Sequence, residues 1–352
     1  MMDLPDLADG LTVRERRLIL AAARSGKRGR ERPVASALRV LRTAYEQDPA
    51  AGFDACFLAA LRLAQPDACR YPLFLPHGNW GSLLESPAGA PFLALDLSDA
   101  GLAVLSRGRS DKEPFPSEFP HLLCNGAWAR TGTVERSDPL YADPASFDDL
   151  LAGHASPSGA VTGGRLLAWL PPHNLGEVCA GLLAFVDRPQ TSLEELWALV
   201  PGPDFPTGGV LQDPDRWRDA YARGVGRVRA AARVVRASPG RWKVVDLPYG
   251  LRPEAVARLL ARDVEAVRAG DATCRLVVDA ASPPDLSLEY QVRMVVERNG
   301  KPATMPFVDL FHAFLEGLYR RWGGKRDRKT RVKALLRSWK SRSDRRRTSI
   351  GR

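Results

Sequence analysis

Three short helical segments in the first 65 residues, followed by strand-like alternation, constrain the fold of this chain most. Apolar residues group on one side of residues 13–24, away from Arg16 and Arg17, and helical spacing of apolar residues returns over residues 34–46 and 53–65. Three helices followed by strands are typical of the winged helix, a helix-turn-helix variant that docks on DNA.

The third segment, residues 53–65 (FDACFLAALRLAQ), lacks the polar surface that a DNA-facing helix needs. Only Asp54, Arg62 and Gln65 are polar, and an aspartate would repel phosphate. A helix that is apolar on all sides is usually buried or lies at an interface. This composition argues against ordinary contact with a DNA groove.

Helical and strand-like patterns alternate in the second half of the chain, which predicts an α+β protein. Helices are expected over residues 174–186, 192–200, 253–268 and 307–322, and strands over residues 225–236, 241–247, 274–280 and 289–298. Between the two halves, residues 128–165 are rich in Gly, Ser, Ala and Asp and weakly periodic. They are expected to form an insertion or a long mobile loop.

The positive charge is concentrated at the C-terminal end. Residues 320–352 hold 15 basic and 2 acidic side chains, whereas residues 1–319 hold 36 basic and 39 acidic ones. Such a block predicts a polyanion partner, most simply nucleic acid, and its alternative is a solvated, disordered end. The basic residues that we expect to contact DNA are Lys325, Arg326, Arg328, Lys329 and Arg331.

The composition argues against several other classes of protein. No run of 18 or more apolar residues exists, and the acidic N-terminus lacks a signal pattern, so we expect a cytoplasmic protein without a membrane span. The five cysteines form no CxxC pair, and the five histidines do not cluster with them. This spacing argues against a disulfide framework and against a metal site.

Four stretches, read together, resemble the breakage-reunion (A) subunit of bacterial type IIA topoisomerases, DNA gyrase and topoisomerase IV. They occur in the family's order and span most of residues 3–320, which indicates a divergent and truncated relative. The stretches are LPDLADGL at 4–11 with Arg16 and Arg17, RYPL at 70–73 leading into GNWGS at 78–82, LPPHNLGEV at 170–178 and PGPDFPTGG at 201–209.

The resemblance implies a domain order and a set of partners. It implies a winged-helix domain over residues 1–110, an α/β tower domain over residues 111–318 and a basic tail over residues 319–352. The family's coiled-coil gate and C-terminal β-pinwheel are expected to be absent. In the family the Mg²⁺ and the ATP belong to a partner subunit, so we expect no cofactor in this chain. The partners implied are DNA and a gyrase B-like or topoisomerase IV B-like subunit, with a homodimer left open.

The residues that cut DNA in the family are replaced in this chain. A family tyrosine attacks a DNA phosphate beside an arginine that holds it. Alignment from Gly81-Ser82 without gaps puts Phe92 at the tyrosine and Pro91 at the arginine, and residues 85–105 contain no tyrosine. A phenyl ring has no oxygen with which to attack, and proline carries no charge. We therefore predict no catalytic residue here and a cleavage-defective protein.

The resemblance also suggests residues that contact DNA. Leu170 lies where the family places an isoleucine that wedges between base pairs, and leucine has the volume for that task. Its alternative is packing into the tower domain. Arg16 and Arg17 match family arginines near the DNA gate, with a solvated helix face as the alternative.

Three functions are compatible with these patterns. The first, which we favour, is a nucleoid-associated protein that binds or bends DNA without cutting it. The second is an active, ATP-dependent topoisomerase of the A type that uses another tyrosine together with an ATPase partner. The third is a non-catalytic interaction module that modulates gyrase, which the apolar segment 53–65 favours.

Overall fold

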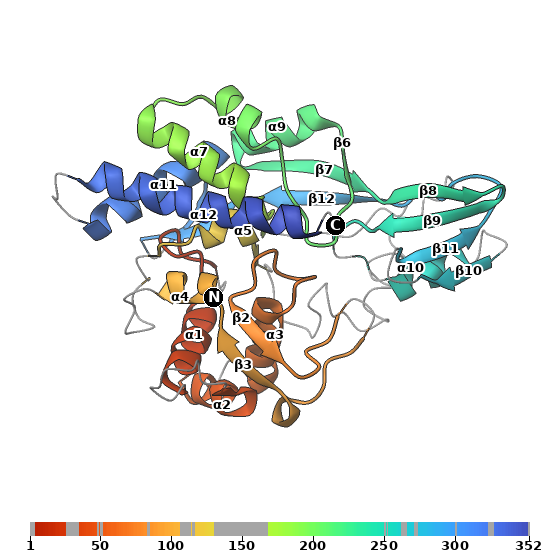
Figure 1. The fold of residues 1–352 in the computed structure, drawn as a ribbon, viewed down its shortest axis with the longest axis horizontal. Coiled ribbons are helices and arrows are strands. Elements are labelled where there is room, and N and C mark those ends of the chain that lie inside the picture. The colour runs from red at the N-terminus through yellow and green to blue at the C-terminus, as the bar shows by residue number, and fades with distance from the viewer. Residues whose placement is uncertain are drawn as a thin grey trace.

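The structure is a computed structural model, shown in Figure 1. It describes residues 4–25, 35–47, 49, 52–82, 85–105, 114, 117–129, 168–249, 251, 253–261, 266–270, 274–299, 301–322 and 327–350. Its mixture of helices and strands confirms the predicted α+β class.

The N-terminal unit combines four helices with a three-stranded antiparallel sheet (Figure 1). The sheet order is β1-β3-β2, so the last strand in the chain lies between the two earlier ones. The elements are α1 (Val13–Ser25), β1 (Ala35–Ser36), α2 (Ala37–Glu46), α3 (Phe53–Ala64), β2 (Phe74–His77), the 3-10 turn η2 (Ala90–Phe92), β3 (Ala94–Leu97) and α4 (Asp99–Leu105).

The three predicted N-terminal helices are confirmed, and their apolar spacing explains how they pack. In α2 the buried residues Ala37, Val40, Leu41 and Ala44 follow helical spacing, with Val40 and Leu41 three and four residues after Ala37 and Ala44 four and three residues after them. The apolar α3 buries Leu61 and Leu63. An apolar stripe on each helix needs the other two to cover it, which produces this cluster.

The rest of the chain builds two further sheets with helices against them (Figure 1). A five-stranded sheet has the order β4-β5-β12-β7-β6, a four-stranded sheet has the order β10-β11-β9-β8, and β13 pairs with β14 as a hairpin. The strands are β4 (Ala127–Ala129), β5 (Ala168–Leu170), β6 (Val210–Gln212), β7 (Val225–Ala231), β8 (Arg233–Ser238), β9 (Arg241–Asp246), β10 (Ala266–Ala269), β11 (Leu276–Asp279), β12 (Ser287–Arg293), β13 (Val295–Arg298) and β14 (Lys301–Thr304). The helices are α5 (His121–Asn125), α7 (Leu175–Asp187), α8 (Leu193–Leu199), α9 (Pro214–Arg223), α10 (Pro253–Leu260), α11 (Phe307–Trp322) and α12 (Arg328–Ile350).

The C-terminal segment departs from the predicted basic tail. Residues 328–350 form the helix α12, which lies along α7 and also contacts α11 (Figure 1). Val332, Leu336 and Trp339 are buried, and their spacing of four and three places them on one side of the helix. Three apolar residues among so many charges are a weak signal, which is why the charge pattern alone suggested a solvated end.

One further sequence prediction is partly wrong, and another falls almost entirely outside the described residues. The helix expected over residues 253–268 ends at Leu260, and Ala266–Ala269 form strand β10, whose four residues all pair with β11. Pairing with β11 therefore makes residues 266–269 a strand, although their apolar spacing also fits a helix. The insertion expected over residues 128–165 lies outside the described residues except for its first two, which belong to β4.

Candidate nucleic-acid interface

The HGNWGS stretch folds into a tight loop after β2. Its centre is the buried Trp80, whose indole nitrogen donates to the carbonyl oxygens of His77 at 3.1 Å and Ala94 at 3.0 Å. The Asn79 side chain accepts from the amide of Gly81 at 2.9 Å. Gly78 has a φ of +92°, and a Cβ there would lie 2.9 Å from the carbonyl oxygen of Phe92, so only glycine fits. The loop is thereby fixed against the turn that carries Phe92.

Pro91 and Phe92 lie at the exposed tip of that turn. The amide of Phe92 donates to Gly89 at 2.9 Å, which closes the 3-10 turn η2. Ala90 before them and Leu93 after them are buried, whereas the Phe92 side chain is 81% exposed. The position that resembles the family's nucleophile therefore reaches solvent, but it presents a ring without a hydroxyl.

Four of the described tyrosines are poor replacements for that hydroxyl. Tyr221, Tyr249 and Tyr290 are fully buried. The Tyr71 hydroxyl oxygen accepts from the amide of Leu175 at 2.8 Å, and burial raises the pKa of this phenol to about 12. A phenol that is harder to ionise is a poorer nucleophile.

Three of the family-like stretches meet at the junction between the N-terminal unit and the rest of the chain. Arg70 donates twice to one carboxylate oxygen of Asp204, at 2.9 and 3.1 Å, and Asn174 donates to the same oxygen at 3.0 Å. The amide of Asp204 donates to the carbonyl of Pro172 at 2.8 Å. We define this junction network as Arg70, Tyr71, Asn125, Asn174 and Asp204.

The remaining members of the junction network bind backbone groups. The Asn125 side chain donates to the carbonyl oxygen of Tyr71 at 2.9 Å and accepts from the amide of Tyr71 at 2.7 Å. Asn174 also caps α7 by accepting from the amides of Gly176 and Glu177. Sequence analysis missed the pairing of Arg70 with Asp204 because 134 residues separate them. The signal available was that both residues lie in stretches that resemble one family.

His173 lies beside this network in the interior and has a structural role. One ring nitrogen, Nδ1, lies 2.8 Å from the carbonyl oxygen of Leu123, and the other, Nε2, lies 2.6 Å from the hydroxyl of Tyr221. Burial lowers the pKa of His173 to about 4, so the ring is neutral near pH 7. In the neutral form Nδ1 donates to the carbonyl while Nε2 accepts from the tyrosine.

Arg16 does not offer a free cation to DNA. It is buried, and its guanidinium donates to both carboxylate oxygens of Asp9, at 2.7 and 3.3 Å, and to the carbonyl of Leu11 at 3.0 Å. A buried arginine that is fully engaged in this way holds the N-terminal loop onto α1. The contacts of Arg16 therefore indicate a structural role instead of the predicted contact with DNA.

The other predicted DNA contacts differ in accessibility. Leu170 ends β5, pairs with Ala127 and is 2% exposed. It therefore packs in the interior, which was the alternative to a role as a DNA wedge. Arg17 is half-buried on α1. Arg328, Lys329 and Arg331 are exposed on the first turn of α12, whereas Lys325 and Arg326 lie outside the described residues.

Helix α12 is anchored to the rest of the chain by several side chains and also exposes basic residues. Trp339 donates to the carbonyl of Glu118 at 3.2 Å, Arg342 pairs with Asp99 at 3.6 Å, and Lys333 pairs with Asp187 on α7. The helix thus ties the N-terminal unit to α7. The exposed basic residues Arg328, Lys329, Arg331 and Arg337 are distributed around the rest of the helix, and we call this group the α12 basic face.

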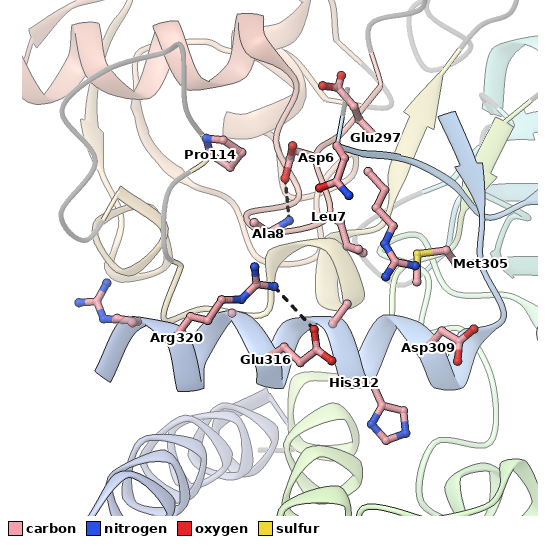
Figure 2. Close-up of a pocket in the computed structure, with 15 residues that line it drawn as sticks. Asp6, Leu7, Ala8, Pro114, Glu297, Met305, Asp309, His312, Glu316 and Arg320 are labelled. Atoms are coloured by element: carbon pink, nitrogen blue, oxygen red, sulfur yellow. Dashed lines mark hydrogen bonds and ion pairs between the residues drawn. The ribbon is translucent and has the colours of Figure 1, made fainter. Parts of the chain in front are cut away.

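A cleft of about 1070 Å³ separates the N-terminal loop from α11 (Figure 2). Asp6, Glu297, Asp309 and Glu316 line it together with three arginines, and Glu316 pairs with Arg320 at 3.6 Å. The mixed charge does not fit a phosphate backbone. Among the described residues there is also no group of three or more His, Cys, Asp or Glu side chains arranged to hold a metal ion. No described helix has both the length and the hydropathy needed to cross a membrane.

The described residues form an α+β protein in which a polar junction connects the N-terminal unit to the rest of the chain and an exposed turn carries Phe92. Comparison with known proteins shows which proteins this chain is similar to. The sequence pattern of the family formed by the A subunits of DNA gyrase and topoisomerase IV matches residues 165–297. The DNA gyrase A subunit of Kosmotoga olearia is 26% identical over 358 residues, covering 90% of this chain and 40% of that protein. The DNA gyrase A subunit of Chlamydia muridarum is 32% identical over 73% of this chain and 29% of its own length.

The A subunits of topoisomerase IV match to a similar extent. The one from Streptococcus pyogenes is 29% identical over 75% of this chain and 30% of that protein. The chain is a divergent relative of the A subunits of DNA gyrase and topoisomerase IV, as its stretches predicted. It spans less than half the length of these curated relatives.

Proposed function

We propose that this chain binds DNA on a scaffold of the gyrase A type and does not cut it. The observation that carries the proposal is the exposed Phe92, at the position that aligns with the family's nucleophile. A side chain that attacks DNA must be exposed and must carry a nucleophilic atom. Phe92 meets the first requirement and fails the second.

The arrangement of the N-terminal unit supports a winged-helix assignment for this domain. A helix, a short strand, two helices and two further strands follow one another, and the last strand lies in the middle of the sheet. The loop between β2 and β3 then corresponds to the wing, with Phe92 close to its end. In this proposal the wing, rather than the apolar α3, approaches the duplex.

The α12 basic face supports the sequence-independent part of the binding. Each phosphate neutralised by a lysine or arginine releases counterions, so affinity falls as salt rises. We propose that this face replaces Arg16 and Leu170, which are buried, as a contact with the DNA backbone. A chain that binds chromosomal DNA in this way would be found with the nucleoid.

Binding to duplex DNA as a function of salt tests this proposal. The variant replaces Arg328, Lys329 and Arg337 by glutamine and keeps Arg331, which pairs with Asp327 at 2.6 Å. The slope of log affinity against log salt should fall by about 2 to 3, since each phosphate contact contributes about 0.9.

The matched control replaces three exposed arginines of α9 by glutamine. Arg216, Arg218 and Arg223 each lie within 4.0 Å of an aspartate three or four residues away. This control removes the same charge from another surface and should leave the slope nearly unchanged. An equal loss of slope in both variants would contradict a role for the α12 basic face.

A second candidate function rests on α3. Its side chains Phe57 and Leu58 are only half-buried, although they are apolar. A half-exposed apolar helix side supports docking on a protein partner, either a second copy or a B-like subunit. Sedimentation of the chain alone and with a gyrase B subunit tests this candidate, and a monomer in both mixtures would remove it.

A further inference from the structure

Phe92 stands apart from the other apolar side chains on the described surface. It is 81% exposed, whereas the next most exposed large apolar residue, Val210, is 49% exposed. Single exposed apolar residues are common, but a phenyl ring with most of its surface in water is a strong feature. Its exposure indicates a contact that the isolated chain does not make.

The backbone fixes the point from which this ring projects. Pro91 has a restricted φ, the Phe92 amide closes the turn onto Gly89, and the buried Leu93 accepts from the amide of Ala37 at 3.0 Å. The close packing of Gly78 against the Phe92 carbonyl fixes the other side of the turn. A residue whose backbone is held this way loses little backbone freedom when its side chain binds.

The elements next to η2 expose polar and basic residues. His77 and Asn79 are exposed on the adjoining loop. Helix α2 packs against η2 and exposes Arg39 and Arg42, and within the described part of the chain neither guanidinium pairs with a carboxylate. An exposed aromatic ring with exposed arginines on a neighbouring helix is a combination that can contact bases and phosphates.

Resting on the proposed DNA binding, we propose that Phe92 is a stacking wedge that inserts between bases where the duplex is already interrupted. The ring offers an apolar face to a base, and Arg39 and Arg42 lie on the adjacent helix for the flanking phosphates. A gap or nick lowers the cost of unstacking, so the wedge selects interrupted DNA over intact duplex.

A second copy of the chain fits the exposed Phe92 ring less well than a DNA base does. A phenylalanine side chain offers at most about 200 Å² of surface, whereas a stable interface needs about 800 Å² from each partner. The exposed Pro91 beside Phe92 adds only a small apolar surface. The size and the charge of the site therefore favour a single base over a protein face.

The test measures binding of the full chain to an intact duplex and to the same duplex with a one-nucleotide gap flanked by 2-aminopurine. The variants are Phe92→Ala, Phe92→Trp and, as a matched control, Leu102→Ala on α4, which is also exposed. We expect Phe92→Ala to weaken binding to gapped DNA about 5- to 100-fold, to leave intact duplex nearly unaffected and to abolish the 2-aminopurine response. Phe92→Trp and Leu102→Ala should both behave as wild type.

Three results would overturn the wedge, and they differ from one another. Equal binding of wild type and Phe92→Ala to gapped DNA would reject the wedge and leave DNA binding intact. No binding of wild type to either DNA at low salt would reject the proposed function and the wedge together. Loss of self-association in Phe92→Ala, measured by sedimentation without DNA, would assign the ring to a second copy.

Discussion

The junction network and the Phe92 turn both lie in stretches that resemble the family. Side chains of the junction network bind one another, whereas the side chain at the turn is exposed. In the junction, Arg70, Asn174 and Asp204 satisfy one another with hydrogen bonds of about 3 Å. In the turn, Phe92 makes no side-chain hydrogen bond and lies in solvent. The junction connects distant parts of the chain, whereas the turn only displays a side chain.

This difference separates what the fold requires from what the chemistry requires. A change at Asp204 leaves a guanidinium and an amide without an acceptor, so the fold itself opposes it. A change from tyrosine to phenylalanine at an exposed position removes no buried contact and no hydrogen bond within the chain. The fold of this chain therefore does not depend on whether position 92 carries a tyrosine or a phenylalanine.

The largest effect is expected from the buried pair of Asp9 and Arg16, which holds the N-terminal loop. Asp9→Ala removes both carboxylate hydrogen bonds of a buried guanidinium, which among the described residues keeps only Asp6, at 4.0 Å, as an ion-pair partner, and should lower the free energy of unfolding by about 3 kcal/mol. Urea denaturation measures the change. The control is Asp215→Ala, which breaks the exposed pair with Arg218 and should cost less than about 1 kcal/mol. Equal effects of the two substitutions would show that the Asp9 pair is not important for the fold.

A pH dependence should follow from the two buried histidines near the junction. Burial lowers the pKa of His121 and of His173 to about 4, against about 6.5 in an unfolded chain. Because the unfolded state then binds more protons, stability is complete above about pH 6.5 and is lost as the pH falls towards 4. The free energy of unfolding should be about 2 kcal/mol per histidine lower at pH 5 than at pH 7. His77→Gln, an exposed control, should show the wild-type dependence, and identical stability at the two pH values would contradict the assignment.

A smaller loss is expected from the junction itself, because it is only partly buried. Asp204→Ala removes the acceptor of Arg70 and Asn174 and should cost about 2 kcal/mol of the free energy of unfolding. The double substitution Arg70→Ala/Asp204→Ala measures the coupling between the two side chains. Strictly additive losses would show that the ion pair does not connect the two parts.

The smallest effect on stability is expected at the turn. Phe92→Ala should change the free energy of unfolding by no more than about 0.5 kcal/mol, because the ring is exposed. The same urea titration that detects the Asp9 and Asp204 variants measures it. A loss of more than about 2 kcal/mol would mean that Phe92 supports the fold, and the contrast between the two regions would not hold.

Sequence patterns predicted local structure and ancestry better than they predicted contacts. The helices at 13–24, 34–46 and 53–65 follow from apolar spacing, and the family stretches identified the relatives correctly. The burial of Arg16 was not predictable, because a basic residue on a helix has the same pattern whether Asp9 covers it or solvent does. The α12 helix was missed because only three buried apolar residues mark it among many charges. Long-range pairing, such as that of Arg70 with Asp204, leaves no local trace at all.

Cleavage of supercoiled plasmid tests the central claim most directly. The chain is incubated with Mg²⁺, plasmid and a gyrase B subunit, and covalent protein–DNA adducts are trapped with denaturant. Pro91→Arg/Phe92→Tyr is assayed in parallel, with Phe92→Ala as the control for general effects at the turn. The account predicts no adduct from wild type or from Phe92→Ala, and an adduct from the double variant would show that only the nucleophile and its arginine are missing. An adduct from the wild-type chain would contradict the account, and the tyrosine linked to DNA would then identify the active site.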